Sequence, residues 1–161
     1  MQNQQTGATA PDAAAPAAPR LEHVNLVVTE IDPTAKFLMA AFPNWRVRGE
    51  GGGEWAGAPR RWAHIGDDDN YVTLNEFKIP AAARGRHRDL QSAEPGLAHL
   101  GFEVSDLNAV VSRLSAAGYE PHHLGETHPH RRNLYYVNEE GLEFEFVEYS
   151  SAIPAEKNLY Q

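Results

Sequence analysis

Two segments of this 161-residue chain repeat each other. Residues 21–32 read LEHVNLVVTEID, and residues 97–108 read LAHLGFEVSDLN. Both open with Leu-X-His, continue as an alternating apolar strand and carry an acidic residue near the end, so His23 and His99 occupy equivalent positions 76 residues apart (99 − 23 = 76). We therefore predict one supersecondary unit, used twice.

A helix follows each of these strands. Asp32 is the predicted cap of the first helix, which covers residues 33–41. Ser105 or Asp106 caps the second helix, over residues 106–117. In both repeats, the spacing of the apolar residues thus changes at the same place from the alternation typical of a strand to the spacing typical of a helix.

Each repeat ends in a predicted hairpin. RRWAHIG and NYVTLNEF flank the turn residues 67–69, and RNLYYVN and LEFEFVEY flank the turn residues 139–141. The order of elements is β-α-β-β-β in residues 21–77 and again in residues 97–149. A loop over residues 78–96 joins these two modules.

Composition sets the limits of the domain. Residues 1–20 are rich in alanine and proline and are predicted to be a disordered tail, residues 21–149 a single domain, and residues 150–161 a C-terminal tail. There are no cysteines and no apolar run near the roughly 18 residues of a membrane span, so we expect no membrane partner and a cytoplasmic location. The net charge of −8 argues against a nucleic-acid partner, although Arg84–Arg88 forms one short basic cluster.

Strand alternation places polar side chains on one face of the predicted sheets. His23 and His99 lie opposite the apolar residues of their strands, and Glu143 and Glu145 lie opposite the phenylalanines of the last strand. A carboxylate in mid-strand is costly to bury without a cation or hydrogen bonds, and Glu145 is the better centred of the two. We expect two curved sheets, each with a helix on its outer face, to join edge to edge around a cleft lined by these groups.

LEHVNLVV, LAHLGFEV and GLEFEFVEY resemble the ligand-bearing strands of the vicinal-oxygen-chelate superfamily, which includes glyoxalase I, extradiol dioxygenases and antibiotic-resistance proteins. The resemblance covers residues 21–149. It implies an α+β fold in which two βαβββ modules form an incomplete barrel around a metal cleft. It also implies that His23, His99 and Glu145 are the metal ligands, and that the protein is a homodimer.

The fourth ligand position bears on the type of reaction. Alignment of the two repeats places Thr73 opposite Glu145, where glyoxalase I-like enzymes are expected to carry a carboxylate or an amide. Glu76 aligns with Glu148 on the other strand face, and a one-residue slip or a bulge would be needed to bring it into the site. Two histidines and one carboxylate are typical of non-heme Fe(II) oxygenases, so Fe(II) is the favoured metal, with zinc, nickel and manganese as alternatives.

The stretch from His128 to Glu145 resembles the extradiol dioxygenase signature, although Glu139 replaces its proline and Glu126 a small or apolar residue. The resemblance implies that His128 is a catalytic acid or base and that Tyr135 orients a substrate oxygen. The alternative for His128 is a solvated loop residue. The adjacent pair His122-His123 is interpreted as the surface end of a strand.

Three functions follow from these observations. The favoured one is an Fe(II) extradiol-type ring-cleaving dioxygenase, or a related oxygenase, for a small molecule with adjacent oxygens. The second is a divalent-metal lyase or isomerase of the glyoxalase type, which the threonine in the fourth position disfavours. The third is a non-catalytic protein that binds a drug, for which retained metal ligands have no evident use.

Overall fold

The computed structural model describes residues 19–78, 80 and 89–160. The predicted tail over residues 1–20, except Pro19 and Arg20, lies outside these residues, as does the basic cluster Arg84–Arg88. The elements follow one another in the order β1 (His23–Val28), α1 (Ile31–Ala41), β2 (Arg46–Trp55), β3 (Ala58–Gly66), β4 (Tyr71–Phe77), β5 (Leu100–Glu103), α2 (Leu107–Ala116), β6 (His123–Leu124), β7 (Arg131–Val137), β8 (Glu143–Tyr149) and α3 (Pro154–Lys157).

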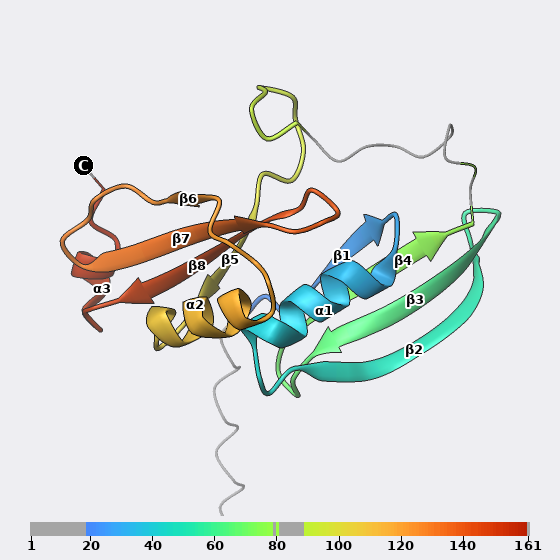
Figure 1. Cartoon of the computed structure of the whole chain (residues 1–161), viewed down its shortest axis with the longest axis horizontal. Coiled ribbons are helices and arrows are strands. Elements are labelled where there is room, and N and C mark those ends of the chain that lie inside the picture. Colours follow the sequence, from blue (N-terminus) through green and yellow to red (C-terminus); the bar gives the residue numbers. More distant parts are fainter. Residues whose placement is uncertain (1–18, 79, 81–88, 161) are drawn as a thin grey trace, which may run out of the picture.

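The strands form two four-stranded sheets with the same topology (Figure 1). Their orders are β1-β4-β3-β2 and β5-β8-β7-β6. The first strand of each sheet pairs in parallel with the last strand of its module, and the other pairs are antiparallel. These are the two predicted βαβββ modules, and they are confirmed. The barrel is not closed: β1 and β5 each lie at an edge of their own sheet and do not pair with each other.

Both predicted helices are present, but their first turns differ. Asp106 caps α2 as predicted, because its carboxylate accepts a hydrogen bond from the backbone N–H of Ala109 at 2.9 Å. The prediction that Asp32 caps α1 is wrong. This helix begins two residues earlier than predicted, at Ile31, and Asp32 forms an ion pair with Arg61 instead.

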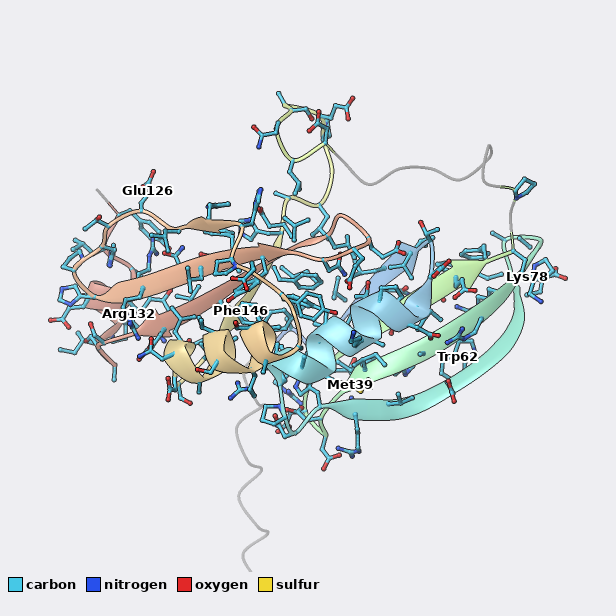
Figure 2. All side chains as sticks on the ribbon, viewed as in Figure 1. Met39, Trp62, Lys78, Glu126, Arg132 and Phe146 are labelled. Carbon is cyan, nitrogen blue, oxygen red and sulfur yellow. The ribbon has the colours of Figure 1, made fainter. Side chains whose placement is uncertain are left out.

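The core lies between the helices and both sheets. Phe37 of α1 is fully buried, and its ring centroid lies 4.7 Å from that of Phe144 in the other module. At the end of α1, the carbonyl of Ala41 accepts a hydrogen bond from the Arg113 guanidinium of α2 at 2.8 Å. Figure 2 shows the side chains crowded in this region, with Phe146 among them. The helices therefore also join the two modules, which differs from the prediction that each simply covers the outer face of its own sheet.

The C-terminal residues pack on the second module. The short helix α3 ends at Lys157, whose ammonium group binds the Glu103 carboxylate at 2.8 Å and lies 4.3 Å from the centroid of the Tyr149 ring. The segment predicted as a tail is therefore partly helical and attached to the domain. Within the described residues, no helix has the length and apolar character needed to cross a membrane.

Candidate metal centre

A histidine and a glutamate meet where the parallel strands β5 and β8 lie side by side. His99 directly precedes β5, and Glu145 stands in β8 opposite Gly101. The imidazole Nε2 of His99 lies 3.2 Å from Oε2 of Glu145. Two donor atoms that each bind one ion at about 2.1 Å with tetrahedral or octahedral angles are about 3.0–3.4 Å apart, so this pair fits two ligands of one divalent ion.

The carboxylate of Glu145 is held by its neighbours on β7. Its Oε1 atom accepts hydrogen bonds from the Tyr135 hydroxyl at 2.9 Å and from the Asn133 amide at 2.5 Å. Both bonds leave Oε2 directed at His99. Burial, together with the hydrogen bond to Glu145 and its negative charge, raises the pKa of Tyr135 to about 12. The hydroxyl therefore stays protonated and remains a donor at neutral pH.

Tyr135 also contacts two imidazole rings. The ring of His123 is stacked on it, with centroids 4.1 Å apart, and the ring of His99 meets it edge-on at 5.4 Å. The structure thus brings together three of the five residues predicted for the site: His99, Glu145 and Tyr135.

His23 lies on the predicted face but is held elsewhere. Its ring stacks on Tyr71 with centroids 4.9 Å apart, and its Nδ1 atom lies 2.7 Å from the Glu22 carboxylate. His23 and His99 both line a groove of about 600 Å³. Even so, the ligand atoms of His23, His99 and Glu145 do not all lie within 4.8 Å of one another.

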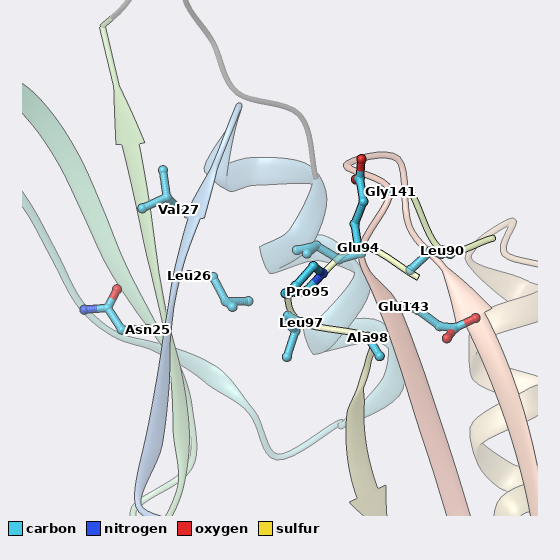
Figure 3. Close-up of a pocket in the computed structure, with 12 residues that line it drawn as sticks. Asn25, Leu26, Val27, Leu90, Glu94, Pro95, Leu97, Ala98, Gly141 and Glu143 are labelled. Carbon is cyan, nitrogen blue, oxygen red and sulfur yellow. The ribbon is translucent and has the colours of Figure 1, made fainter. Parts of the chain in front are cut away.

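The orientation of the two sheets explains this separation. The apolar faces of both sheets pack on the helices, so the opposite faces point outwards. Figure 3 shows Asn25 of β1 and Glu143 of β8, which lie on these outward faces, pointing in opposite directions. Within one chain, His23 and His99 line the same groove, but the ligand atoms of His23, His99 and Glu145 do not meet at one point. Residues of both β1 and β5 line this groove, but the two edge strands do not pair with each other.

The fourth ligand position remains without a carboxylate. Thr73 is buried in β4, between Asn25 and His64 on the neighbouring strands. Glu76 does not slip into its place, because the register of β4 is continuous with both neighbours. Its carboxylate instead accepts a hydrogen bond from the backbone N–H of Ile31 at 3.1 Å.

His128 lies apart from the metal pair. Its Nε2 donates to the carbonyl of Leu159 at 2.8 Å, and its Nδ1 accepts from the backbone N–H of His130 at 3.1 Å. It precedes β7, whose first residue, Arg131, is four residues or about 13 Å from Tyr135 along the strand. A catalytic role for His128 stays a prediction, and its position adds no support to it.

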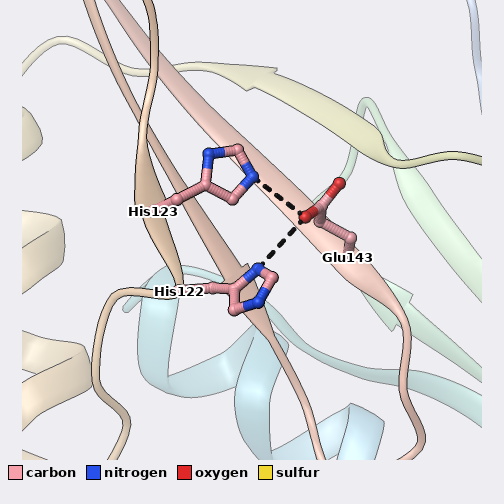
Figure 4. A group of neighbouring side chains, drawn as sticks. All are labelled: His122, His123 and Glu143. Carbon is pink, nitrogen blue, oxygen red and sulfur yellow. Dashed lines mark hydrogen bonds and ion pairs between the residues drawn. The ribbon is translucent and has the colours of Figure 1, made fainter. Parts of the chain in front are cut away.

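A second group of potential ligands was missed in the sequence. Ligand atoms of His122, His123 and Glu143 all lie within 4.8 Å of one another (Figure 4), and no other such group of three occurs in the described part of the chain. The sequence contained one signal, the pair of adjacent histidines. This pair was interpreted as the surface end of a strand, and its approach to Glu143 depends on the tertiary pairing of the two-residue strand β6 with β7.

The family model described as "Glyoxalase/Bleomycin resistance protein/Dioxygenase superfamily" matches residues 20–146 of the sequence. The chain belongs to this superfamily. No curated protein matches it.

Solved structures show the same fold as this superfamily member. A glyoxalase family protein from Bacillus cereus is 22% identical, with 86% of this chain and 99% of that chain covered and a TM-score of 0.66. TnmS3, an antibiotic binding protein from Streptomyces sp. CB03234, is 17% identical, with 84% and 100% covered and a TM-score of 0.55. The fosfomycin resistance protein FosX from Listeria monocytogenes, complexed with Mn(II) and sulfate, is 18% identical, with 88% and 98% covered and a TM-score of 0.53.

Proposed function

We propose that this superfamily member is a divalent-metal-dependent enzyme acting on a small molecule with two adjacent oxygen atoms. The observation that carries the proposal is the pair formed by His99 Nε2 and Glu145 Oε2, 3.2 Å apart. Imidazole and carboxylate donors suit Fe(II), manganese, nickel and zinc. A divalent ion at this pair would act as a Lewis acid on the oxygens of the substrate.

The chain's own residues would orient this pair and the substrate. Tyr135 and Asn133 fix the rotamer of Glu145 through its Oε1 atom. On the other side, Nδ1 of His99 lies 3.8 Å from the Glu143 carboxylate, which favours the tautomer that leaves Nε2 free to bind metal. Because the Tyr135 hydroxyl donates its single proton to Glu145, its oxygen would orient a substrate hydroxyl beside the metal by accepting a hydrogen bond from it.

We further propose that His23 reaches the metal from a second copy of the chain. Within one chain, the ligand atoms of His23, His99 and Glu145 do not all lie within 4.8 Å of one another. The strands β1 and β5 both have an unpaired edge, and the apolar side chains of Val27 and Leu97 are exposed near these edges. A homodimer that places one β1 beside the β5 of its partner would cover both edges and complete the ligand set.

For the reaction, we propose Fe(II)-dependent oxygenase chemistry. Three protein ligands leave coordination positions for both a chelating substrate and O2, and the buried Thr73 supplies no carboxylate in the fourth position. The same ligand set is compatible with a glyoxalase-type lyase or isomerase. Structural likeness to fosfomycin resistance proteins makes fosfomycin a third substrate to test.

Metal analysis and a substrate screen test this function. Tag-free protein is stripped of metal, loaded anaerobically with Fe(II) and assayed for O2 uptake with a panel of catechols. Parallel samples with Ni2+ or Zn2+ receive a hemithioacetal, and samples with Mn2+ receive fosfomycin. Glu145→Gln should lose one metal equivalent per chain and any activity found, whereas Glu139→Gln, a charge change in the nearby turn, should lose neither. Unchanged metal content in Glu145→Gln would exclude the site.

Subunit complementation tests whether the His23 ligand comes from the same chain as Glu145 or from the second copy. The variants His23→Ala and Glu145→Gln are co-expressed with two different tags, and the mixed dimer is purified. If His23 acts across the interface, the mixed dimer carries one intact site and regains half of the metal. If all three ligands come from one chain, the mixed dimer has no intact site and binds no metal at this position.

A further inference from the structure

The group of His122, His123 and Glu143 lies on the same sheet face as the pair of His99 and Glu145. Oε1 of Glu143 lies 3.4 Å from Nδ1 of His122 and 3.2 Å from Nε2 of His123 (Figure 4). Both distances fall in the range of about 3.0–3.4 Å for two ligands of one ion. Adjacent residues of a regular strand point to opposite faces, so both rings can face Glu143 only because β6 begins at His123 and His122 lies outside it.

The tautomer of His123 makes this contact unusual. Its Nδ1 donates to the backbone carbonyl of Leu124 at 3.1 Å, since a carbonyl can only accept. In the neutral ring, Nε2 then carries a lone pair, and this lone pair faces a carboxylate oxygen at 3.2 Å. Two acceptors at this distance repel each other unless a cation, either a proton or a metal ion, lies between them.

The carboxylate of Glu143 also needs a cation. Its side chain is only 11% exposed, and in the described part of the chain its ionic partners are all imidazoles, those of His99, His122 and His123. A mostly buried carboxylate without a lysine or arginine partner is costly. The stacking of His123 on Tyr135 fixes the orientation of the His123 imidazole without a bound metal ion.

We infer that His122, His123 and Glu143 form a second divalent-metal site, distinct from the one at Glu145. Two imidazoles and one carboxylate are the donor set of Zn2+ and of neighbouring borderline metals such as Ni2+ and Cu2+. The two histidine side chains are 44% and 47% exposed, so water or a solvent-borne ligand can complete the coordination.

The two sites are neighbours but are not a bridged pair. Glu143 and Glu145 are two residues apart on one face of β8, which separates their Cα atoms by about 7 Å. A dinuclear centre needs ions about 3.5–4 Å apart. The link between the sites is Glu143, whose Oε1 faces the second site and whose Oε2 faces Nδ1 of His99.

Zn2+ binding to metal-free, tag-free protein tests this inference. Calorimetry and equilibrium dialysis should find a site that the double variant His122→Ala/His123→Ala lacks, with affinity lowered more than about 100-fold, since loss of even an outer hydrogen-bond partner of a ligand costs about 10–100-fold. Glu145→Gln should keep this site. The matched control is His130→Ala, which removes another partly exposed imidazole near a carboxylate and should bind as the parent does.

The outcomes separate the two sites. Loss of one equivalent in the double variant and of a different one in Glu145→Gln supports both. If the double variant loses one equivalent of Zn2+ and Glu145→Gln loses none, the second site is supported and the proposed catalytic site is rejected. Undiminished Zn2+ binding in the double variant overturns the inference and shows that only a proton lies between His123 and Glu143. Electron paramagnetic resonance of bound Cu2+ provides an independent readout. In a Glu145→Gln background, which removes the other site, the Cu2+ spectrum should show hyperfine lines from imidazole nitrogen. Adding His122→Ala and His123→Ala should remove these lines.

Discussion

Glu76 and Glu148 occupy equivalent positions in the two modules and perform the same structural role. Oε2 of Glu76 accepts a hydrogen bond from the first backbone N–H of α1, at Ile31, and Oε2 of Glu148 accepts one from the first backbone N–H of α2, at Leu107, both at 3.1 Å. Each carboxylate also binds an arginine on the neighbouring strand. A negative charge at the N-terminus of a helix satisfies an otherwise unpaired donor and complements the helix dipole.

Glu76→Gln should therefore lower stability without changing metal binding. The variant loses the charge that faces the N-terminus of α1 and Arg61, and we expect the free energy of unfolding to fall by about 1 kcal/mol. Urea denaturation measures this change. Glu54→Gln, which removes the same charge from an exposed position on β2, should have little effect. Loss of a metal equivalent in Glu76→Gln would reinstate Glu76 as a ligand.

Glu148 should make stability depend on pH. The hydrogen bond from Arg132, followed by that from the Leu107 N–H, lowers the pKa of this carboxyl below its ordinary value of 4.5. A lowered pKa in the folded protein contributes stability above the ordinary value and loses it as the pH falls through the folded-state value. The stability difference between the parent and Glu148→Gln should thus be greatest near neutral pH and should shrink in acid.

Urea denaturation of the two proteins at about pH 7 and about pH 3 measures this dependence, because glutamine cannot titrate. A difference that stays constant between these conditions would show that the contacts of Glu148 with Arg132 and Leu107 do not depend on its charge.

Phe37→Ala should have a large effect, because this side chain joins the two modules. It is fully buried and contacts aromatic rings of the second module, among them Phe144 and Tyr119. We expect the free energy of unfolding to fall by about 3–5 kcal/mol, as for other large-to-small core substitutions. Phe77→Ala, at a partly exposed position beside Trp55, should cost clearly less. Equal costs would mean that α1 is not the main junction between the modules.

The repeat in the sequence was sufficient to predict the modules and their order. Alternation also placed His99 and Glu145 on one face, because the period of a strand is a local property. The cap of α1 was mispredicted, because Glu76 reaches the helix from a strand that is 45 residues away in the sequence. Local cap signals such as Asp32 carry no information about such a partner.

Features that depend on packing between elements could not be predicted from the sequence. The apolar residues of α1 indicated that one face is buried, but not that Phe37 would contact the second module as well as its own. The pairing of β6 with β7, which brings His123 onto Tyr135 and towards Glu143, likewise depends on tertiary contacts. The failure of His23 to join His99 and Glu145 also depends on packing, since it follows from how the two sheets are placed around the helices.

Tyr135→Phe tests how the proposed metal ligand is held. The Tyr135 hydroxyl donates to Oε1 of Glu145 at 2.9 Å, and this bond helps direct Oε2 at His99. Without it, Asn133 alone positions the carboxylate, and we expect metal affinity at the Glu145 site to fall about 10–100-fold, as for other outer partners of metal ligands. Because His99 and Glu145 both remain, the stoichiometry at saturating metal should not change.

The neighbouring tyrosine provides the matched control for this prediction. Tyr136 is fully buried, and its hydroxyl has no hydrogen-bond partner within the described residues. Tyr136→Phe therefore removes the same atom from the same strand without touching Glu145, and metal affinity should stay as in the parent. Mn2+ titration of both variants, followed by calorimetry, measures the difference. Equal affinities for Tyr135→Phe and Tyr136→Phe would mean that the phenol does not position Glu145, and Tyr135 would then act only on the substrate.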